Sequence, residues 1–168
     1  MQPITLPLRE RFLAGMASAA CTVNVVTTDG EAGRFGTTVS AMSSVSADGE
    51  HPTLLVCMHH AAGTTQAIRR NGVFCVNVLC HDQSEISDMF AGRLRREEAD
   101  KFAGAPWLRT ACGAWRLEQA LVAFECRLVG DNRVGTHHVF VGEVHELHLR
   151  SGAPLVYSNR AYGTVHSH

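Results

Sequence analysis

The sequence lacks the features of several large protein classes. No apolar run approaches the roughly 20 residues of a membrane-spanning helix, so we expect no membrane segment. The formal net charge is −1 and no basic stripe is present, which disfavours nucleic acid as a partner. The start of the chain does not resemble a secretory signal, and no C-x-x-C occurs. We therefore expect a cytoplasmic protein whose six cysteines are reduced, mostly buried thiols.

The motifs of the common nucleotide and hydrolase sites are also missing. There is no G-x-G-x-x-G after a strand and no G-x-x-x-x-G-K-[ST], which argues against both common nucleotide folds. No G-x-S-x-G is present to supply a serine nucleophile. The ten histidines show no zinc-site spacing, so we expect scattered solvated or capping imidazoles and no metal. This scarcity of acid–base machinery suits an enzyme whose cofactor carries the chemistry.

What the sequence does contain fits one domain over residues 1–168, with 45% hydrophobic and 18% charged residues. Apolar and turn patterns predict strands over residues 21–28, 34–46, 52–59, 73–79, 120–129, 138–149 and 154–157. They predict helices over 7–20, 66–70, 82–92 and 95–102, the third opened by a capping box at Asp82–Glu85. Turns are expected at 48–51 and 130–133. Strands and helices do not alternate, which favours an antiparallel β-barrel with short helices over a doubly wound sheet.

The predicted strand 34–46 is unusual because small and hydroxylated residues fill it. They are Thr37, Thr38, Ser40, Ser43, Ser44 and Ser46. Such side chains would let a flat ligand lie close to the backbone and would offer it hydroxyls and peptide N–H groups. The alternative is an ordinary edge strand rich in Ser and Thr, and the pattern alone leaves both open.

Two further segments have a functional and a structural interpretation. The helix start at Ala62–Thr65 suits a phosphate, because free N–H groups and the helix dipole favour an anion, although plain N-capping by a threonine explains the same residues. Together with the small-residue strand, this helix start would hold the ring and phosphate of one nucleotide-like ligand. In Gly135-Thr136-His137, the imidazole lies either beside a ligand at the mouth of a barrel or merely after a capped turn.

In their joint order, several segments resemble the short-chain flavin reductases that serve two-component flavin monooxygenases, such as the reductase component of 4-hydroxyphenylacetate 3-monooxygenase. The matching segments are Ala20–Gly30, Gly36-Thr-Thr-Val-Ser-Ala-Met-Ser-Ser-Val-Ser46, Pro52–Cys57, Phe74-Cys-Val-Asn-Val-Leu79, Phe90-Ala-Gly92, Ala120–Cys126 and Gly135-Thr-His137. The resemblance implies a split β-barrel of the FMN-binding type with Greek-key order, assembled as a homodimer. It implies reduction of non-covalent FMN or FAD by NADH, and a separate oxygenase that receives the reduced flavin.

The resemblance also implies the residues of the site. The isoalloxazine and ribityl chain would contact Thr37, Thr38, Val39, Ser40, Ala41 and Ser44. The flavin tail would follow Cys57, Met58 and His59, its phosphate would meet Gly63 and Thr64, and Phe90 would lie near the tail. His137 would contact the nicotinamide as the one catalytic candidate, and Tyr162 would close the site.

Three questions stay open at the level of sequence. Ala62 and Gly63 replace larger polar residues that are frequent in the family, so the choice between FMN and FAD is undetermined. A related enzyme would use the same reduced flavin to reduce the cobalt of a corrin, as in cob(II)yrinic acid a,c-diamide. A third possibility is a non-catalytic flavin- or haem-binding module on a similar barrel.

Overall fold

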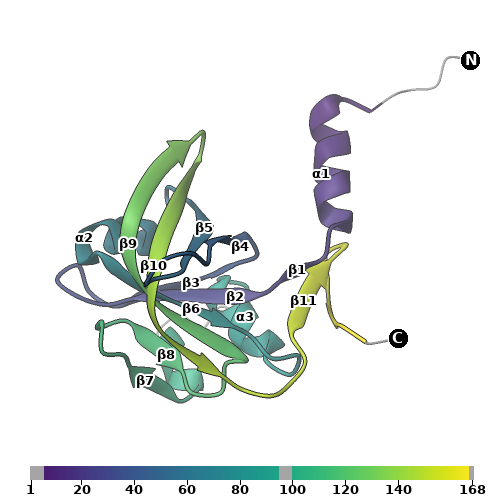
Figure 1. The fold of residues 1–168 in the computed structure, drawn as a ribbon. Helices are drawn as coiled ribbons and strands as arrows, with labels where there is room; N and C mark the ends of the chain where they lie inside the picture. The colour runs from purple at the N-terminus through teal and green to yellow at the C-terminus, as the bar shows by residue number, and fades with distance from the viewer. Residues whose placement is uncertain (1–5, 95–99, 167–168) are drawn as a thin grey trace, which may run out of the picture.

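The computed structural model describes residues 6–94 and 100–166, which form a mainly β structure with short helices (Figure 1). One antiparallel sheet contains seven strands: β2 (Asn24–Thr28), β3 (Phe35–Val39), β4 (Met42–Ser46), β5 (Thr53–His59), β6 (Val73–Val78), β9 (Val122–Val134) and β10 (His137–Leu149). Their order in the sheet is β3-β2-β6-β9-β10-β5-β4. The predicted β class is confirmed.

The two edge strands of this sheet, β3 and β4, are consecutive in the chain. Only Ser40 and Ala41 separate them, yet they lie at opposite ends of the strand order, so the sheet must curl to bring its edges together. The Cys57 N–H donates a 3.0 Å hydrogen bond to the carbonyl oxygen of Ala41 at this junction. β3 and β4 do not pair, so the ladder is not closed into a barrel. The prediction of one strand over residues 34–46 was therefore wrong.

Two smaller sheets complete the described β structure. β1 (Cys21–Thr22), β11 (Leu155–Ser158) and β12 (Ala161–Thr164) form a three-stranded sheet, and β7 (Trp107–Arg109) pairs with β8 (Trp115–Leu117). β11 was predicted over 154–157, but β7, β8 and β12 were not, because strands of three or four residues show little periodic pattern.

The longest helix, α1 (Leu8–Ser18), stands away from the main sheet and buries none of its residues (Figure 1). α2 (Gly63–Asn71) ends as predicted at Gly72, which has φ +70° and donates its N–H to the Ile68 carbonyl. No helix among the described residues is long and apolar enough to cross a membrane.

The helix α3 (Ser84–Phe90) forms without the predicted capping box. Its N-cap is Gln83, and no side chain caps it. The Gln83 amide instead accepts from the Cys80 N–H at 2.8 Å and donates to the Gln119 carbonyl at 2.9 Å, which ties the loop to a distant turn. Of the helix predicted over 95–102, residues 95–99 lie outside the described residues, and Lys101–Gly104 forms a 3₁₀ helix.

The long hairpin of β9 and β10 turns later than predicted. Its two-residue turn is Gly135-Thr136, where Gly135 has φ +57°, and the polar segment 130–133 lies inside β9. Asp131 is retained in the strand because its carboxylate contacts both His138 and Arg69, at 2.5 and 2.7 Å. Tertiary contacts therefore override the local turn preference.

The described core consists of two apolar clusters. One contains Val26, Val56, Phe74, Val76 and Phe140, and the other packs Phe90 and Phe102 with residues of β2, β6 and β8. Burial supplies most of the stability of such clusters, at roughly 25 cal/mol per Å² of apolar surface. All six cysteines are free. Cys75, Cys80 and Cys126 are buried as predicted, whereas Cys21 and Cys57 are only half-buried.

Candidate functional site

A cavity of about 290 Å³ lies where β3, β5 and the start of β10 meet. Its lining includes nine of the predicted site residues: Thr37, Thr38, Val39, Ser40, Ala41, Cys57, Met58, His59 and His137. Ala62, immediately before α2, lines it as well. The structure thus brings together segments that are up to 100 residues apart in the sequence (137 − 37).

The floor of this cavity is the open edge of the main sheet. β3 pairs only with β2, so the backbone groups on its outer edge have no ladder partner. Thr37 and Thr38 are half-buried, whereas Ser40 and Ala41 are exposed, and none carries a bulky side chain. The Thr38 hydroxyl donates to the Ser87 carbonyl at 2.7 Å, which leaves its oxygen free only to accept. A flat, polar ligand can therefore reach backbone groups here.

Two histidines, His59 and His137, line this cavity together with β3. His137 faces His59 across the β5–β10 pair, and their rings meet edge to face with centroids 5.2 Å apart. His60 stacks on His59 at 4.8 Å. Desolvation and the positive charge of Arg133 lower the pKa of His60, which keeps this ring neutral near pH 7. His138, the next residue on β10, points to the other face and is buried, as alternation along a strand requires.

The predicted phosphate site is the start of α2. No side chain caps this helix, since its N-cap is Ala62, so the alternative of threonine capping is wrong. The Thr65 hydroxyl donates backwards to the His59 carbonyl at 2.9 Å, and Thr64 is buried. Gly63 lies under the ring of Phe35, where an added Cβ would be 3.1 Å from Cε1. The first turn has no acidic residue, so its N–H groups present a positive end beside the cavity.

A second cavity of about 160 Å³ adjoins the first and shares Thr38, Val39 and Ser40 with it. Tyr162 lines this second cavity rather than the first. Its hydroxyl donates to Asp88 at 2.6 Å and lies 2.8 Å from the Ser87 hydroxyl. Burial and the hydrogen bond to Asp88 raise the pKa of Tyr162, so the phenol stays protonated at neutral pH.

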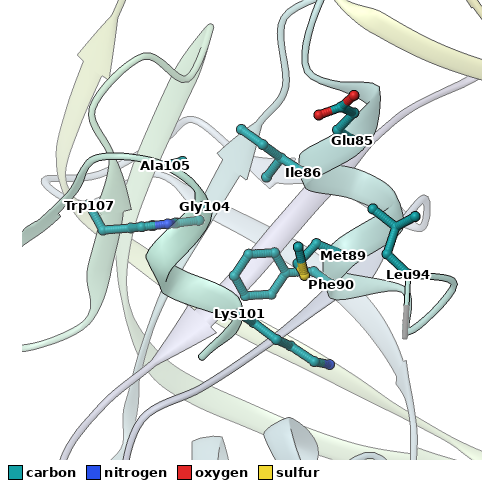
Figure 2. Close-up of a pocket in the computed structure, with 9 residues that line it drawn as sticks. All are labelled: Glu85, Ile86, Met89, Phe90, Leu94, Lys101, Gly104, Ala105 and Trp107. Carbon is teal, nitrogen blue, oxygen red and sulfur yellow. The ribbon is translucent and has the colours of Figure 1, made fainter. Parts of the chain in front are cut away.

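Four predicted residues line neither cavity: Ser44, Gly63, Thr64 and Phe90. Phe90 is 2% exposed and packs behind β3, where a Cβ added to Gly36 would lie 2.6 Å from its Cε1. Figure 2 shows Phe90 with Met89 and Trp107 around a separate pocket of about 100 Å³. Ser44 is exposed on β4.

Within residues 6–94 and 100–166, no group of three or more His, Cys, Asp or Glu side chains is arranged to hold a metal ion. Several histidines pair instead with single carboxylates: His138 with Asp131 at 2.5 Å and His148 with Glu125 at 2.9 Å. These pairs explain part of the histidine content without a ligand.

A family described as the flavin reductase like domain matches residues 16–166, which is most of the chain. The chain belongs to the flavin reductase family. Its resemblance to that family, inferred above from ordered segments, is thereby confirmed.

Individual relatives agree with this assignment. FMN reductase (NADH) RutF 2 of Methylorubrum extorquens is 45% identical over 90% of this chain and 86% of its own length. A crystal structure from Haemophilus somnus superposes with a TM-score of 0.86 at 36% identity, covering 95% of this chain and all of the other. BorF, the flavin reductase component of a bacterial two-component tryptophan halogenase, gives a TM-score of 0.83 at 28% identity, covering 95% and 99%.

In this flavin reductase, sequence reasoning missed Arg93 and Tyr157, which line the second cavity beside Tyr162. Arg93 follows the recognised segment Phe90-Ala-Gly92 but belongs to no motif. Tyr157 was predicted only as part of a strand. Only the fold, which brings β11 and the end of α3 to the same place, reveals them.

Proposed function

We propose that this chain is an NADH-dependent flavin reductase that reduces FMN or FAD and releases the reduced flavin to a separate oxygenase. Family membership and relatives named as NADH-dependent FMN reductases support this proposal. The named flavin reductase component of a two-component halogenase supports transfer of reduced flavin to a second protein. The observation that carries the proposal is the cavity that joins Thr37–Ala41, Cys57–His59 and His137.

The residues of this cavity fit a flavin mononucleotide. The small side chains and open backbone edge of β3 suit a flat ring with many hydrogen-bonding atoms. The uncapped first turn of α2, at Gly63 and Thr64, suits the phosphate at the other end. The segment Cys57–His59 connects these two places. A flavin held there supplies the ring that accepts the hydride of NADH.

The protein's own contribution is mainly positional. Thr37–Ala41 would support the flavin ring, and His137 would contact the nicotinamide. Holding two rings face to face converts a bimolecular reaction into an effectively unimolecular one, and this accounts for the rate enhancement. No side chain of the cavity has to donate or remove a proton in the hydride step.

We further propose that the curled sheet is the split barrel with Greek-key order implied by the resemblance, and that the chain is a cytoplasmic homodimer. The short connection between the two sheet edges supports the former. The apolar residues Leu8, Phe12, Leu13 and Met16 are exposed on α1, which supports contact with a second copy.

The test is NADH oxidation by the purified protein, monitored with FMN, with FAD and with no flavin. We expect turnover only when flavin is present, and a reduced flavin that separates from the protein on gel filtration under anaerobic conditions. A protein that binds flavin but never oxidises NADH would be the non-catalytic module and would contradict the proposal. The relatives named above give the corrin reductase alternative no support.

A further inference from the structure

Arg93 is fixed at the edge of the second cavity by three groups from three elements, α3, β11 and β12. Its Nη1 donates to the Asp88 carboxylate at 3.1 Å and to the Tyr162 hydroxyl at 3.2 Å. Its Nη2 donates to the Tyr157 hydroxyl at 3.4 Å. The guanidinium carbon also lies 5.5 and 5.9 Å from the centroids of the two tyrosine rings, within cation–π range.

These contacts leave part of the guanidinium available. Arginine has five N–H donors, and the bonds to Asp88, Tyr157 and Tyr162 use three of them. The Nε–H and one Nη2–H have no acceptor among the described residues, and the side chain is 52% exposed. Nε and Nη2 lie on one edge of the planar group, the geometry with which arginine binds a phosphate through two parallel hydrogen bonds.

The position of Arg93 relative to the flavin cavity suggests which phosphate it binds. The second cavity begins at Thr38, Val39 and Ser40, which also line the first. Arg93 is the only Lys or Arg among the described residues that line the two cavities, and no Asp or Glu lines either. The start of α2 lies on the first cavity and not on the second, so the flavin phosphate and Arg93 have different places.

We propose that Arg93 binds the pyrophosphate of the pyridine dinucleotide that donates the hydride. This inference rests on the proposed function, because it assumes that a nicotinamide stacks on the flavin above Thr38–Ser40. The two phosphates of such a dinucleotide would lie outside the first cavity. The second cavity adjoins it and contains one fixed cation, Arg93. Preorganisation by Asp88 and the two tyrosines lowers the entropy cost of this contact.

The experiment compares two hydride donors in wild type and in Arg93→Met. NADH carries the pyrophosphate, whereas dihydronicotinamide riboside has the same reactive ring and no phosphate. Loss of a charged, two-bond contact should raise KM for NADH about 10- to 100-fold, since hydrogen bonds to charged groups contribute about 1.5–3 kcal/mol. We expect kcat with NADH, KM for the riboside and Kd for FMN to change less than twofold. Arg93→Lys keeps the positive charge but cannot form two parallel hydrogen bonds, so it should give an intermediate KM for NADH.

Arg109→Met is the matched control, because it removes one positive charge from β7, outside both cavities. An equal loss with both donors would make Arg93 structural and would overturn the proposal. So would an unchanged KM for NADH, or a loss confined to FMN affinity. Should Arg93→Met fail to fold, salt tests the wild type: KM for NADH must rise with ionic strength and KM for the riboside must not. A wild type that oxidises neither donor would refute the proposed function instead.

Discussion

The hydroxyl of Thr38, on the edge strand β3 that lines the proposed flavin cavity, donates a 2.7 Å hydrogen bond to the carbonyl oxygen of Ser87 on α3. The Ser87 side chain in turn lies 2.8 Å from the Tyr162 hydroxyl. One helical residue therefore connects the edge strand β3 with β12. This connection fixes the boundary between the two cavities and makes α3 the support of the proposed site.

Replacement of Thr38 by valine should destabilise the protein. The change keeps the shape of the side chain but leaves the Ser87 carbonyl without its donor, at a cost of about 1–2 kcal/mol in the free energy of unfolding. Thr37→Val is the control, since no hydrogen bond from the Thr37 side chain exists among the described residues. Chemical denaturation of both variants measures the difference, and equal losses would show that the Thr38–Ser87 bond contributes nothing specific.

Gly36→Ala should destabilise the protein, because the new methyl group would clash with the Phe90 ring that packs against β3. The new Cβ would lie 2.6 Å from Cε1 and 2.8 Å from Cδ1 of the buried Phe90 ring, so strand and ring must separate. Overpacking of this kind costs about 1–3 kcal/mol. Gly104→Ala has open space around its Cβ and should stay within about 0.5 kcal/mol of wild type. Thermal unfolding compares the pair, and an unaffected Gly36→Ala would mean that Phe90 packs elsewhere.

His137→Ala should weaken the use of NADH more than it slows the hydride step. The imidazole lines the cavity together with β3, where it is proposed to contact the nicotinamide, and hydride transfer itself needs no proton from it. We expect KM for NADH to rise about tenfold, the equivalent of one modest contact, with the reduction rate at saturating NADH within a few-fold of wild type. Stopped-flow reduction of bound flavin measures both. Complete loss of reduction would assign His137 an essential chemical role.

The Asp131 carboxylate should make stability depend on pH in the acid range. Burial raises its pKa, but hydrogen bonds from His138 and Arg69 outweigh this and hold the pKa below its usual 3.8. The folded protein therefore keeps Asp131 charged to lower pH than the unfolded chain does. Its stabilising contribution is complete above about pH 4 and is lost as the pH falls through the folded-state value.

Asp131→Asn should accordingly be less stable than wild type by about 1–3 kcal/mol at pH 7, and the difference should shrink below about pH 4. Urea titrations at several pH values provide the measurement, with the exposed turn residue Asp48→Asn as control. A difference that stays constant down to pH 2 would show that the carboxylate charge is not what stabilises the β9–β10 hairpin.

The sequence predicted those helices and strands whose ends carry a local signal. The end of α2 and the start of β6 were predictable, because Asn71-Gly72 is a strong helix stop and an apolar run follows it. The break between β3 and β4 was not, because Ser40-Ala41 contains no Gly, Pro, Asn or Asp, and serine alone is a weak turn signal. The β9–β10 turn was misplaced because Asp131 has its partners, Arg69 and His138, on α2 and β10.

The candidate site residues also divide into those with a local sequence signal and those that only long-range contacts reveal. Thr37–Ala41 and His137, which line one cavity, were predicted because they lie in contiguous segments that resemble a family. Phe90 lies in such a segment too, yet helical geometry turns its ring behind β3, away from both cavities. Arg93 was not predicted, because its place at the second cavity depends on two tyrosines more than 60 residues away. Long-range contacts of this kind leave no local pattern.

The most direct test of the account is a crystal structure of the protein with FMN. The flavin ring should lie on the open edge of β3 over Thr37–Ala41, its phosphate should meet the first turn of α2 at Gly63 and Thr64, and its outer face should be open beside His137. A flavin bound anywhere else, or with its ring away from β3, would contradict the account.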